Sequence, residues 1–330
     1  MRYLPLAYSI FVLAWFLTNL FAQDSYWLLV GLDKFANYFL FPSILTLLLS
    51  LLSRSTKTIA ASMIPVAITA YFYAPLFWPI TKPPQTTNAA DIRIATFNIW
   101  NHNKDFQGIT TIINDINADV IAIQELTEEQ KPQLKTMLLP TYPHHYISQT
   151  IYGGTTALFS KHPLENIQEL DFGIDRPAIL ADMTVNGIKM TAISAHLNPS
   201  FWAYHNKLWR EIPAAYHQYI KDQNTQASMI VEAASKRSQS QAIFLACDCN
   251  SQETASTNRV LGAFFKDAFR TIGWQLGSPT EENLAYEHKL SHIDYIWFNG
   301  EVTPLGVYRA KNTAGSDHNP IVADFKFERP

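Results

Sequence analysis

The stretch Ala314-Gly315-Ser316-Asp317-His318-Asn319-Pro320 places a carboxylate beside an imidazole at the point where a strand begins. The strand is indicated by apolar residues at every second position that follows, namely Ile321, Ala323, Phe325 and Phe327. A carboxylate can hold a metal ion, and a histidine, which titrates near neutral pH, can contact a phosphate or move a proton. By itself an Asp-His pair in a Gly/Ser turn is more often a capping feature, so its meaning depends on the rest of the chain.

Polar side chains follow other strand-like segments in the same way. Asn98 lies at the end of the alternating segment 91–99, and Glu125 follows the apolar run 120–123. A carboxylate at the end of an apolar run is costly to bury unless it meets a cation. We therefore expect Glu125 to be a metal ligand.

Three further segments end or begin with residues of the same kind. These are His196 and Asn198 after the strand 190–195, Asp248 and Asn250 after the strand 242–246, and Asp294 near the start of the strand 293–298. Together with Asp317 and His318, they predict that polar side chains line one rim of a β-sheet sandwich. Such an oxygen-rich set matches Mg²⁺ or Mn²⁺ and not zinc.

The charges are distributed unevenly along the 330 residues. The first eighty residues hold six formal charges, whereas the chain from residue 81 onward holds 21 Lys and Arg against 26 Asp and Glu, a formal charge of 21 − 26 = −5. A long nonspecific contact with nucleic acid normally needs a basic stripe that releases counterions. The acidic balance weighs against such a contact, but it is compatible with a nuclease that has a short footprint.

Three N-terminal segments lack charge over lengths close to those of membrane-spanning helices. They are residues 4–21 and 35–52, with 18 residues each, and residues 58–80, with 23 residues. About 20 apolar residues are needed to cross roughly 30 Å of hydrocarbon as a helix. We predict three transmembrane helices. The alternatives are a signal peptide followed by buried core helices, or a hairpin that lies in the membrane interface.

The basic residues around these segments predict an orientation. Arg2, Arg54 and Lys57 lie at the ends that the positive-inside rule places in the cytoplasm, although two lysines oppose this assignment. We predict an integral protein of the plasma or inner membrane whose catalytic domain is on the non-cytoplasmic side. The predicted organisation is a membrane domain at 1–80, a linker at 81–90 and a catalytic domain at 91–330.

The two cysteines, Cys247 and Cys249, lie on either side of Asp248 in an apolar run. In a strand, both cysteines point to one face and Asp248 points to the other. A disulfide across a single residue would be strained, and a zinc site would need more ligands. We therefore interpret both cysteines as small buried hydrophobic residues.

Six short motifs contain the polar residues of the predicted rim. They are Thr96-Phe97-Asn98-Ile99-Trp100, Ile123-Gln124-Glu125, Ser194-Ala195-His196-Leu197-Asn198, Asp248-Cys249-Asn250, Ile293-Asp294-Tyr295 and Ser316-Asp317-His318-Asn319-Pro320. In this order they resemble the endonuclease/exonuclease/phosphatase superfamily, which includes pancreatic-type deoxyribonuclease, abasic-site endonucleases, inositol polyphosphate phosphatases and neutral sphingomyelinases. Each motif is weak alone, but six in order over about 220 residues are specific.

The resemblance covers residues 91 to about 327 and implies both a fold and a metal site. The fold is an α/β (α+β) four-layer sandwich, in which two packed β-sheets are flanked by helices; here it is preceded by the predicted membrane helices. The implied reaction is metal-assisted hydrolysis of a phosphoester by water. Asn98 and Glu125 would hold the catalytic Mg²⁺ or Mn²⁺, and Asp317 would be a further ligand.

The resemblance also implies catalytic roles. Asp248 would orient or deprotonate the attacking water, and Asn250 would help to position the water and the phosphate. His196 would donate a hydrogen bond to a phosphate oxygen. Asp294 would fix the tautomer and charge of His318, which would contact the scissile phosphate or transfer a proton. These roles are coherent because phosphoryl transfer chiefly needs positioned groups and neutralised oxygens.

Tyr152, Arg176 and Asn198 are weaker candidates for substrate contacts. Tyr152 precedes the segment that follows a substrate-contacting tyrosine in the nuclease branch, but its spacing is one residue too long. Arg176 precedes a strand beginning near residue 178, and it is equally suited to a surface ion pair with Asp171 or Asp175. The family usually has Gly-Asp-Phe-Asn where this chain has Cys-Asp-Cys-Asn, so the Asp and the Asn are kept.

Three functions are compatible with these residues. The first is a membrane-tethered phosphodiesterase or phosphatase acting on a lipid headgroup or another substrate near the bilayer. The second is a membrane-tethered endonuclease or exonuclease that acts on nucleic acid. The third is an inactive module that binds a phosphorylated partner, and the complete set of motifs argues against it. No protein partner follows from the sequence.

Overall fold

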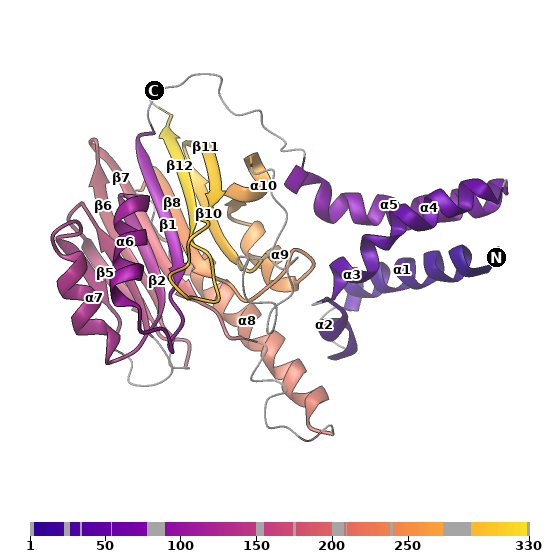
Figure 1. The fold of residues 1–330 in the computed structure, drawn as a ribbon, viewed down its shortest axis with the longest axis horizontal. Helices are drawn as coiled ribbons and strands as arrows, with labels where there is room; N and C mark the ends of the chain where they lie inside the picture. The colour runs from indigo at the N-terminus through magenta and orange to yellow at the C-terminus, as the bar shows by residue number, and fades with distance from the viewer. Residues whose placement is uncertain are drawn as a thin grey trace.

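A computed structural model describes residues 3–22, 27–33, 35–53, 55–77, 90–149, 155–173, 176–199, 208, 210–237, 240–272 and 292–328. Two six-stranded β-sheets pack face to face, and a group of helices near the N-terminus projects from one side of this sandwich (Figure 1).

The first sheet has the strand order β11-β12-β1-β2-β4-β3. Its strands are β1 (Ile92–Asn98), β2 (Val120–Leu126), β3 (His144–Ile147), β4 (Thr155–Ser160), β11 (Val302–Arg309) and β12 (Ile321–Phe327). β1 runs parallel to β2 and antiparallel to β12. The strand that was predicted from the alternation after Pro320 is therefore β12, and it lies inside the sheet beside β1.

The second sheet has the strand order β5-β6-β7-β8-β10-β9. Its strands are β5 (Glu165–Leu170), β6 (Ala178–Val185), β7 (Ile188–His196), β8 (Ala242–Asp248), β9 (Lys266–Asp267) and β10 (Asp294–Gly300). β7 runs parallel to β8, and β8 runs antiparallel to β10. The ends of β7 and β8 and the start of β10 therefore lie at the same edge of this sheet.

Apolar side chains fill the space between the layers. The core between the two sheets includes Ile94, Phe244 and Phe325. The helices α6 (Phe106–Ile116) and α7 (Gln130–Leu138) cover the outer face of the first sheet. The helices α8 (Ile212–Ser235) and α9 (Ser256–Gly262) cover the outer face of the second sheet. The predicted sandwich of two β-sheets flanked by helices is confirmed.

Helix α6 shows how the sequence sets these elements. Its isoleucines recur at helical spacing and are buried against the first sheet. The side chain of Asp105 caps the helix by accepting a hydrogen bond from the backbone N–H of Gly108 at 2.8 Å. Asn117 ends the helix in the left-handed conformation, with φ at 52°, which Asn tolerates better than most residues.

Five helices precede the sandwich and pack on one another. They are α1 (Tyr3–Ala22), α2 (Trp27–Asp33), α3 (Ala36–Leu40), α4 (Pro42–Leu52) and α5 (Thr56–Phe77). Trp15, Phe72 and Tyr73 are buried in their shared apolar cluster. The same cluster includes Phe269 of α10 (Ala268–Ile272), which follows β9. The N-terminal helices are therefore in direct contact with the sandwich.

The prediction of three transmembrane helices is wrong in number. Among the described residues, α1 is the one helix that is long and apolar enough to cross a membrane. The predicted segment 35–52 is divided at Phe41, because Pro42 begins a new helix, and the resulting α4 has only 11 residues. Helix α5 has 22 residues, but it is less apolar than α1 because Ser, Thr, Tyr and Pro recur along it.

The predicted division of the chain into domains stays a prediction. The linker predicted at 81–90 lies outside the described residues except for residue 90. The core helix of a soluble protein and a signal sequence meet the same criterion of length and composition as α1.

The interpretation of Cys247 and Cys249 as separate hydrophobic residues is wrong. Both are fully buried, as expected, but a disulfide joins them. Their Cα atoms lie 5.3 Å apart, on either side of Asp248. The strand geometry that turns Asp248 to the opposite face places both cysteines on one face of β8, which brings their sulfur atoms together.

Candidate active site

Residues predicted from six separate motifs meet at one rim of the sandwich. They are Asn98 and Glu125 from the first sheet, His318 from the segment just before β12 of that sheet, and His196, Asp248 and Asp294 from the second sheet. In the register of the second sheet, Asp248 pairs with His196 on one side and with Asp294 on the other. The rim is therefore built where the edges of two packed sheets come together.

Asp248 is the centre of this rim. Its carboxylate is 1% exposed and accepts hydrogen bonds from Nδ2 of Asn98 at 2.9 Å and from the backbone N–H of Asn250 at 3.1 Å. Its Oδ2 atom lies 3.4 Å from Nε2 of His196 and 3.9 Å from Nε2 of His318. One buried carboxylate thus contacts polar residues from both sheets.

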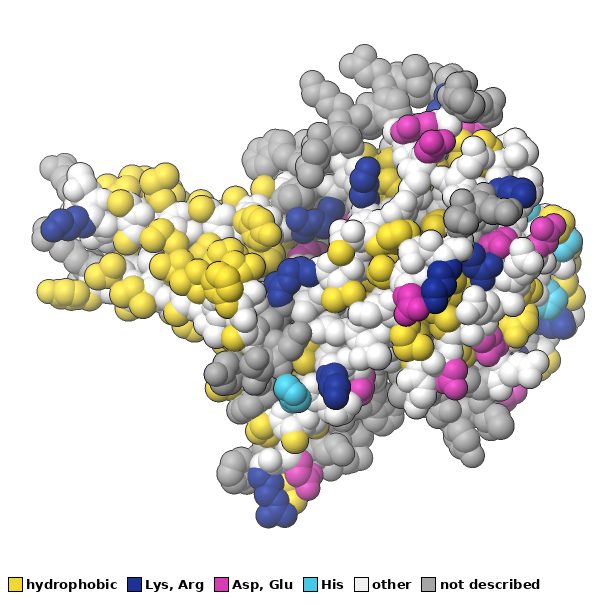
Figure 2. Space-filling model, turned by 180° about the vertical axis from the view of Figure 1, so that it is seen from behind, with side chains coloured by type: hydrophobic (Ala, Val, Ile, Leu, Met, Phe, Trp, Pro, Cys, Tyr) yellow, Lys and Arg dark blue, Asp and Glu magenta, His cyan; other side chains and the backbone are white. Residues whose placement is uncertain are grey.

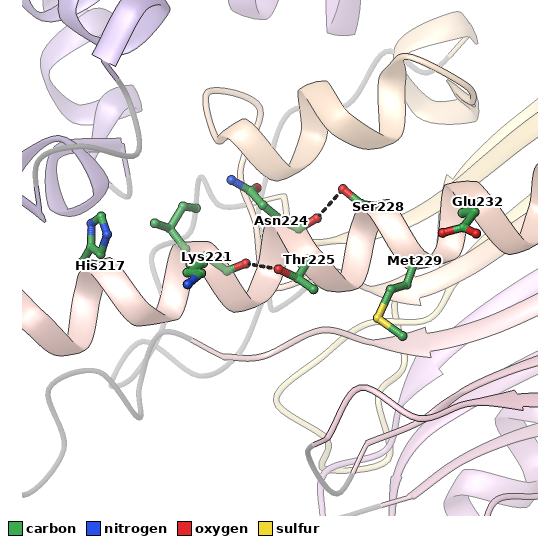
Figure 3. Close-up of a pocket in the computed structure, with 8 residues that line it drawn as sticks. His217, Lys221, Asn224, Thr225, Ser228, Met229 and Glu232 are labelled. Atoms are coloured by element: carbon green, nitrogen blue, oxygen red, sulfur yellow. Dashed lines mark hydrogen bonds between the residues drawn. The ribbon is translucent and has the colours of Figure 1, made fainter.

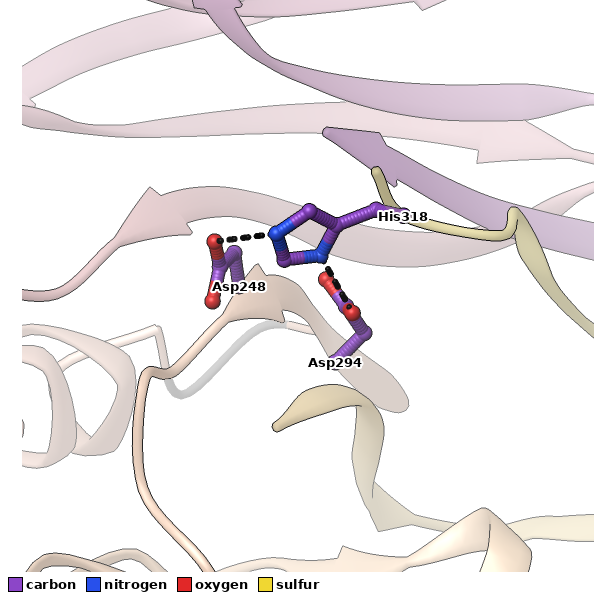
Figure 4. Close-up of side chains that lie close together, drawn as sticks. All are labelled: Asp248, Asp294 and His318. Atoms are coloured by element: carbon purple, nitrogen blue, oxygen red, sulfur yellow. Dashed lines mark hydrogen bonds and ion pairs between the residues drawn. The ribbon is translucent and has the colours of Figure 1, made fainter. Parts of the chain in front are cut away.

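His318 and Asp294 form a buried pair beside Asp248 (Figure 4). Nδ1 of His318 lies 2.7 Å from Oδ2 of Asp294, while Nε2 faces Asp248. Burial lowers the pKa of His318, but the negative charges of Asp294 and Asp248 outweigh burial and raise this pKa well above its usual value. The imidazole is therefore held in its protonated form at neutral pH.

Three residues near the rim have a left-handed backbone conformation, which residues other than glycine rarely adopt. The angle φ is 63° at Trp100, 62° at Glu125 and 49° at Asn250. At Glu125 the register between β2 and β4 shifts, and Oε2 of Glu125 accepts a hydrogen bond from the backbone N–H of Asn101 at 3.1 Å. Such conformations are concentrated at functional sites, where the surrounding structure holds them.

His196 and Arg176 form a second buried pair. Nη1 of Arg176 lies 2.8 Å from Nε2 of His196, and the two residues are 8% and 1% exposed. Burial lowers the pKa of His196 well below its usual value, and the positive charges of Arg176 and His318 act in the same direction. His196 is therefore neutral, and its Nε2 accepts from Arg176. Arg176 is thus a buried residue and not a surface one, whereas Asp175, one of its two alternative partners, lies outside the described residues.

The remaining predicted residues have different positions. Asn250 donates its side-chain amide to the backbone oxygen of Leu197 at 3.0 Å. Oδ1 of Asp317 is buried without a hydrogen-bond partner among the described residues. Asn198 lies just beyond the end of β7, and its side chain is half-buried. Tyr152 lies outside the described residues.

Two glutamines of α8 that sequence reasoning missed support the rim. Nε2 of Gln223 donates to the backbone oxygen of Asn198 at 2.8 Å and to the backbone oxygens of Cys249 and Asn250 at 3.2 Å each. Oε1 of Gln226 accepts from the backbone N–H of Asn198 at 2.9 Å. Both glutamines are buried. Their signal in the sequence is a polar pair on the face of a helix that otherwise packs Ala and Ile inward.

The electrostatics of the rim suit a bound cation. Burial and the nearby charge of Asp294 together raise the pKa of Asp248 to about 8. Burial also raises the pKa of Asp317, as does the charge of Glu125. Four carboxyl groups are therefore gathered where their ionised forms are poorly solvated. A divalent cation would relieve this cost, and carboxylate oxygens are the ligands that Mg²⁺ and Mn²⁺ prefer.

Two different sets of residues offer metal ligands at this rim. Asp248, Asp294 and His318 each provide an atom within 4.8 Å of the others, and they are the only such group among the described residues. The predicted set consists of Asn98, Glu125 and Asp317. In the first set, Nδ1 of His318 and Oδ2 of Asp294 already contact each other at 2.7 Å, so these two atoms serve a buried pair and not a metal ion.

A shallow pocket of about 400 Å³ lies away from this rim, on the outer surface of α8. Figure 3 shows that its labelled side chains all come from this one helix. They are His217, Lys221, Asn224, Thr225, Ser228, Met229 and Glu232. None of the predicted site residues lines the pocket, so it is separate from the candidate active site.

A comparison with protein families finds one match. Residues 95–318 match the model of the Endonuclease/Exonuclease/phosphatase family. This range contains Asn98 near its start and ends at His318, and it therefore includes every described residue of the rim. No curated protein sequence matches the chain.

Solved structures share the fold. The endonuclease/exonuclease/phosphatase from Bacteroides vulgatus has a TM-score of 0.57 at 17% identity, with 72% of this chain and 99% of that chain covered. D. rerio TDP2 complexed with a single strand DNA product has a TM-score of 0.57 at 15% identity, covering 71% and 98%. The protein from Beutenbergia cavernae DSM 12333 gives 0.56 at 17% identity, covering 72% and 71%. At these identities the likeness shows the fold alone.

Proposed function

The chain belongs to the endonuclease/exonuclease/phosphatase family, and we propose that it is a divalent-metal-dependent phosphoester hydrolase held at a membrane by its apolar N-terminal helices. One observation carries the catalytic part of the proposal. The buried carboxylate of Asp248 contacts Asn98, His196 and the backbone of Asn250, and His318 faces it at 3.9 Å. Burying several charged groups from two sheets in one place destabilises the fold, and such clusters are typical of functional sites.

Asn98 and Glu125 would hold Mg²⁺ or Mn²⁺, with Asp317 as a further ligand. The unpartnered buried Oδ1 atom of Asp317 supports this assignment. So does the raised pKa of Asp317, because a nearby cation would stabilise its ionised form. A divalent cation bound there polarises the phosphate and offsets the charge that develops on its oxygens.

The protein groups divide the work of hydrolysis among them. A water oxygen attacks phosphorus, the bond from phosphorus to the leaving oxygen breaks, and the leaving oxygen takes up a proton. Asp248 orients the water and accepts its proton, with Asn250 beside it. Protonated His318, held by Asp294, contacts the phosphate and supplies the proton to the leaving oxygen.

Arg176 and His196 would bind the phosphate from the other side. Arg176 is charged and buried, and it lies against His196 at the rim. A guanidinium group is suited to phosphate because it can donate two parallel hydrogen bonds. Asn198 and Tyr152 would add contacts to the rest of the substrate.

The substrate we favour is a small or lipid phosphoester near a membrane. The formal charge of −5 after residue 80 supports this choice over a long nucleic acid. A tethered nuclease is the second candidate, since the fold is shared with D. rerio TDP2, whose structure contains a single strand DNA product. A binding module without activity is the third.

The proposal predicts that hydrolysis depends on a divalent metal. The purified full chain with Mg²⁺ or Mn²⁺ should release p-nitrophenol from bis(p-nitrophenyl) phosphate, EDTA should lower the rate at least about tenfold, and added Mg²⁺ should restore it. Parallel assays with phospholipid vesicles, sphingolipid vesicles, plasmid and single-stranded nucleic acid would identify the substrate class. Binding of these phosphoesters without hydrolysis in any of the assays would favour the inactive binding module.

Exposed apolar side chains support the membrane part of the proposal. Apolar residues cover the projecting helices in Figure 2. Leu4, Ile10, Leu45 and Leu52 are 76%, 60%, 60% and 79% exposed there. Soluble monomers rarely expose a continuous apolar surface of this extent, because water solvates it poorly. We propose that α1 and its neighbours lie in or across the bilayer, with the catalytic domain on the non-cytoplasmic side.

Membrane attachment can be tested with charged substitutions in the full chain. Ile10→Lys with Phe11→Lys, both exposed near the middle of α1, should shift the protein from the membrane fraction toward the soluble fraction, because each lysine costs about 2.5 to 3.5 kcal/mol at the centre of a membrane helix. Ile167→Lys, at an exposed apolar residue of β5, is the matched control and should leave the distribution unchanged. The same ratio of membrane-bound to soluble protein for the wild type, the double variant and the control would contradict the membrane assignment. Protection from protease in oriented vesicles would test on which side of the membrane the catalytic domain lies.

A further inference from the structure

A buried polar residue in the apolar helix α1 joins the N-terminal helices to the sandwich. Asn19 is 1% exposed, and its Nδ2 donates to Oδ1 of Asp33 at 2.5 Å and to the backbone oxygen of Thr254 at 3.5 Å. A buried amide is costly unless it is hydrogen-bonded, so its contacts explain how it is tolerated there. Thr254 in turn donates its hydroxyl to the backbone oxygen of Asp33 at 3.2 Å.

Arg259 of α9 adds further contacts, and we call the four residues Asn19, Asp33, Thr254 and Arg259 the joint. Its Nη1 donates to Oδ1 of Asn19 at 3.0 Å, and its Nη2 lies 3.3 Å from the backbone oxygen of Asn19. Two nitrogens of one guanidinium group therefore contact one residue of α1. Such a paired contact fixes the orientation of the two residues as well as the distance between them. A second arginine, Arg270 of α10, donates to the backbone oxygen of Phe72 in α5 at 2.7 Å.

The joint leads directly to the catalytic rim through residues 250–258. Thr254 lies four residues after Asn250, and α9 begins two residues after Thr254. The segment between them is held by side chains: Nδ2 of Asn258 donates to the backbone oxygen of Gln252 at 2.8 Å and to the hydroxyl of Tyr295 at 2.9 Å. The position of α9 is therefore transmitted to the segment that follows Asn250.

Helix α9 also holds the glutamine that supports the rim. The hydroxyl of Thr257 donates to Oε1 of Gln223 at 3.1 Å, while Nε2 of the same glutamine binds the backbone oxygens of Asn198 and Asn250. A displacement of α9 would therefore reach Asn250 by two routes. One route is the chain itself, and the other is Gln223.

We propose that Asn19 and Arg259 are positioning residues, through which the N-terminal helices fix α9 and thereby set the place of Asn250 at the catalytic rim. The inference rests on the proposed hydrolase function and extends it. The N-terminal helices are then a part of the catalytic framework and not only an anchor. Misplacement of a site by about 1 Å can lower turnover by up to about a hundredfold, so a contact this far from the substrate can matter for catalysis.

A double-mutant cycle in the full chain, purified in detergent, tests this inference with bis(p-nitrophenyl) phosphate and Mn²⁺. Asn19→Leu and Arg259→Met should each lower kcat about tenfold with KM within about twofold of the wild type. The double variant should be no slower than the slower single variant, because both changes break one contact. Arg259→Lys, which keeps the charge, should recover part of the turnover.

Two controls separate positioning from loss of fold. Leu17→Ala, at an exposed position of α1, should leave kcat unchanged. Circular dichroism and Mn²⁺ binding should be the same for all variants at the assay temperature; if Asn19→Leu does not fold, Arg259→Met and Arg259→Lys carry the test. Wild-type turnover in the single variants, or losses that multiply in the double variant, would overturn the inference alone. A wild-type chain that hydrolyses no phosphoester would overturn the proposed function, and the inference with it.

Discussion

Asp248→Asn is expected to lower kcat for phosphoester hydrolysis about a thousandfold. Asparagine has nearly the same shape as aspartate, but an NH₂ group replaces one of the two oxygens. The hydrogen bond from Nδ2 of Asn98 is lost if that NH₂ group takes the place of Oδ2. The amide cannot take a proton from water, and it removes one negative charge from the group that faces His318. Steady-state kinetics on the purified variant, in parallel with the wild type, measure the loss.

The same variant should be more stable than the wild type when no metal is present. Burial is the main reason why the pKa of Asp248 is raised to about 8 in the folded state, so its ionised form is disfavoured there. The free energy of unfolding of the wild type therefore falls as the pH rises from the ordinary pKa of an aspartate toward 8. In EDTA at pH 8, the variant should therefore melt at a higher temperature. Asp182→Asn, at a carboxylate that binds Thr191 and Arg237 away from the rim, is the control for kcat. Turnover of Asp248→Asn within threefold of the wild type would remove Asp248 from the mechanism.

Asp294→Asn is expected to lower kcat about a hundredfold and to change its pH dependence. The Asp294 carboxylate lies 2.7 Å from Nδ1 of His318 and is one of the charges that raise the pKa of this imidazole. Without that charge the pKa of His318 falls, so His318 loses its proton at lower pH. The alkaline limb of the profile of kcat against pH should therefore move to lower pH, and the deficit should shrink as the pH is lowered.

The kinetic profile distinguishes this role from a general weakening of the fold. Loss of stability would scale kcat down at every pH, whereas loss of the His318 proton shifts the limb. Asp267→Asn is a suitable control, because Asp267 is also a buried carboxylate of the second sheet but contacts the backbone of Phe269. An alkaline limb at the wild-type pH in Asp294→Asn would show that Asp294 does not set the charge of His318.

Much of the catalytic fold could be predicted because its signals are local. Alternating residues predicted β12, helical spacing of isoleucines predicted α6, and polar residues at the ends of apolar runs predicted the rim. Asp248 ends β8 and Asp294 begins its antiparallel neighbour β10, so both lie at one edge of the second sheet. Asn98 ends a strand of the first sheet, and its contact with Asp248 depends on the packing of the two sheets.

The N-terminal region was predicted less well because a charge-free run does not reveal its breaks. Pro42 is apolar by composition, yet it starts a helix and divides the run 35–52. Likewise, we predicted no disulfide between Cys247 and Cys249 because a bridge across one residue would be strained. In the structure the two side chains lie on the same face of β8, and a disulfide joins them. Local pattern alone did not decide either case.

Contacts between distant segments had no signature in the sequence. Asn19 and Arg259 are 240 positions apart, and Gln223 holds the backbone of residues on two other loops. The pairing of His196 with Arg176 also depends on how β6 and β7 bring residues 176 and 196 together. Such contacts follow from the packing of complete layers and not from any one segment.

The division of the rim between two sheets has a consequence for how the site is assembled. His318 lies directly before β12, and β12 must insert between β11 and β1 to complete the first sheet. A partly folded chain in which only the second sheet has formed has Asp248 and Asp294 but no His318 opposite them. We therefore expect the complete constellation to exist only after the two sheets have packed together, so that any loosening of their packing separates its halves.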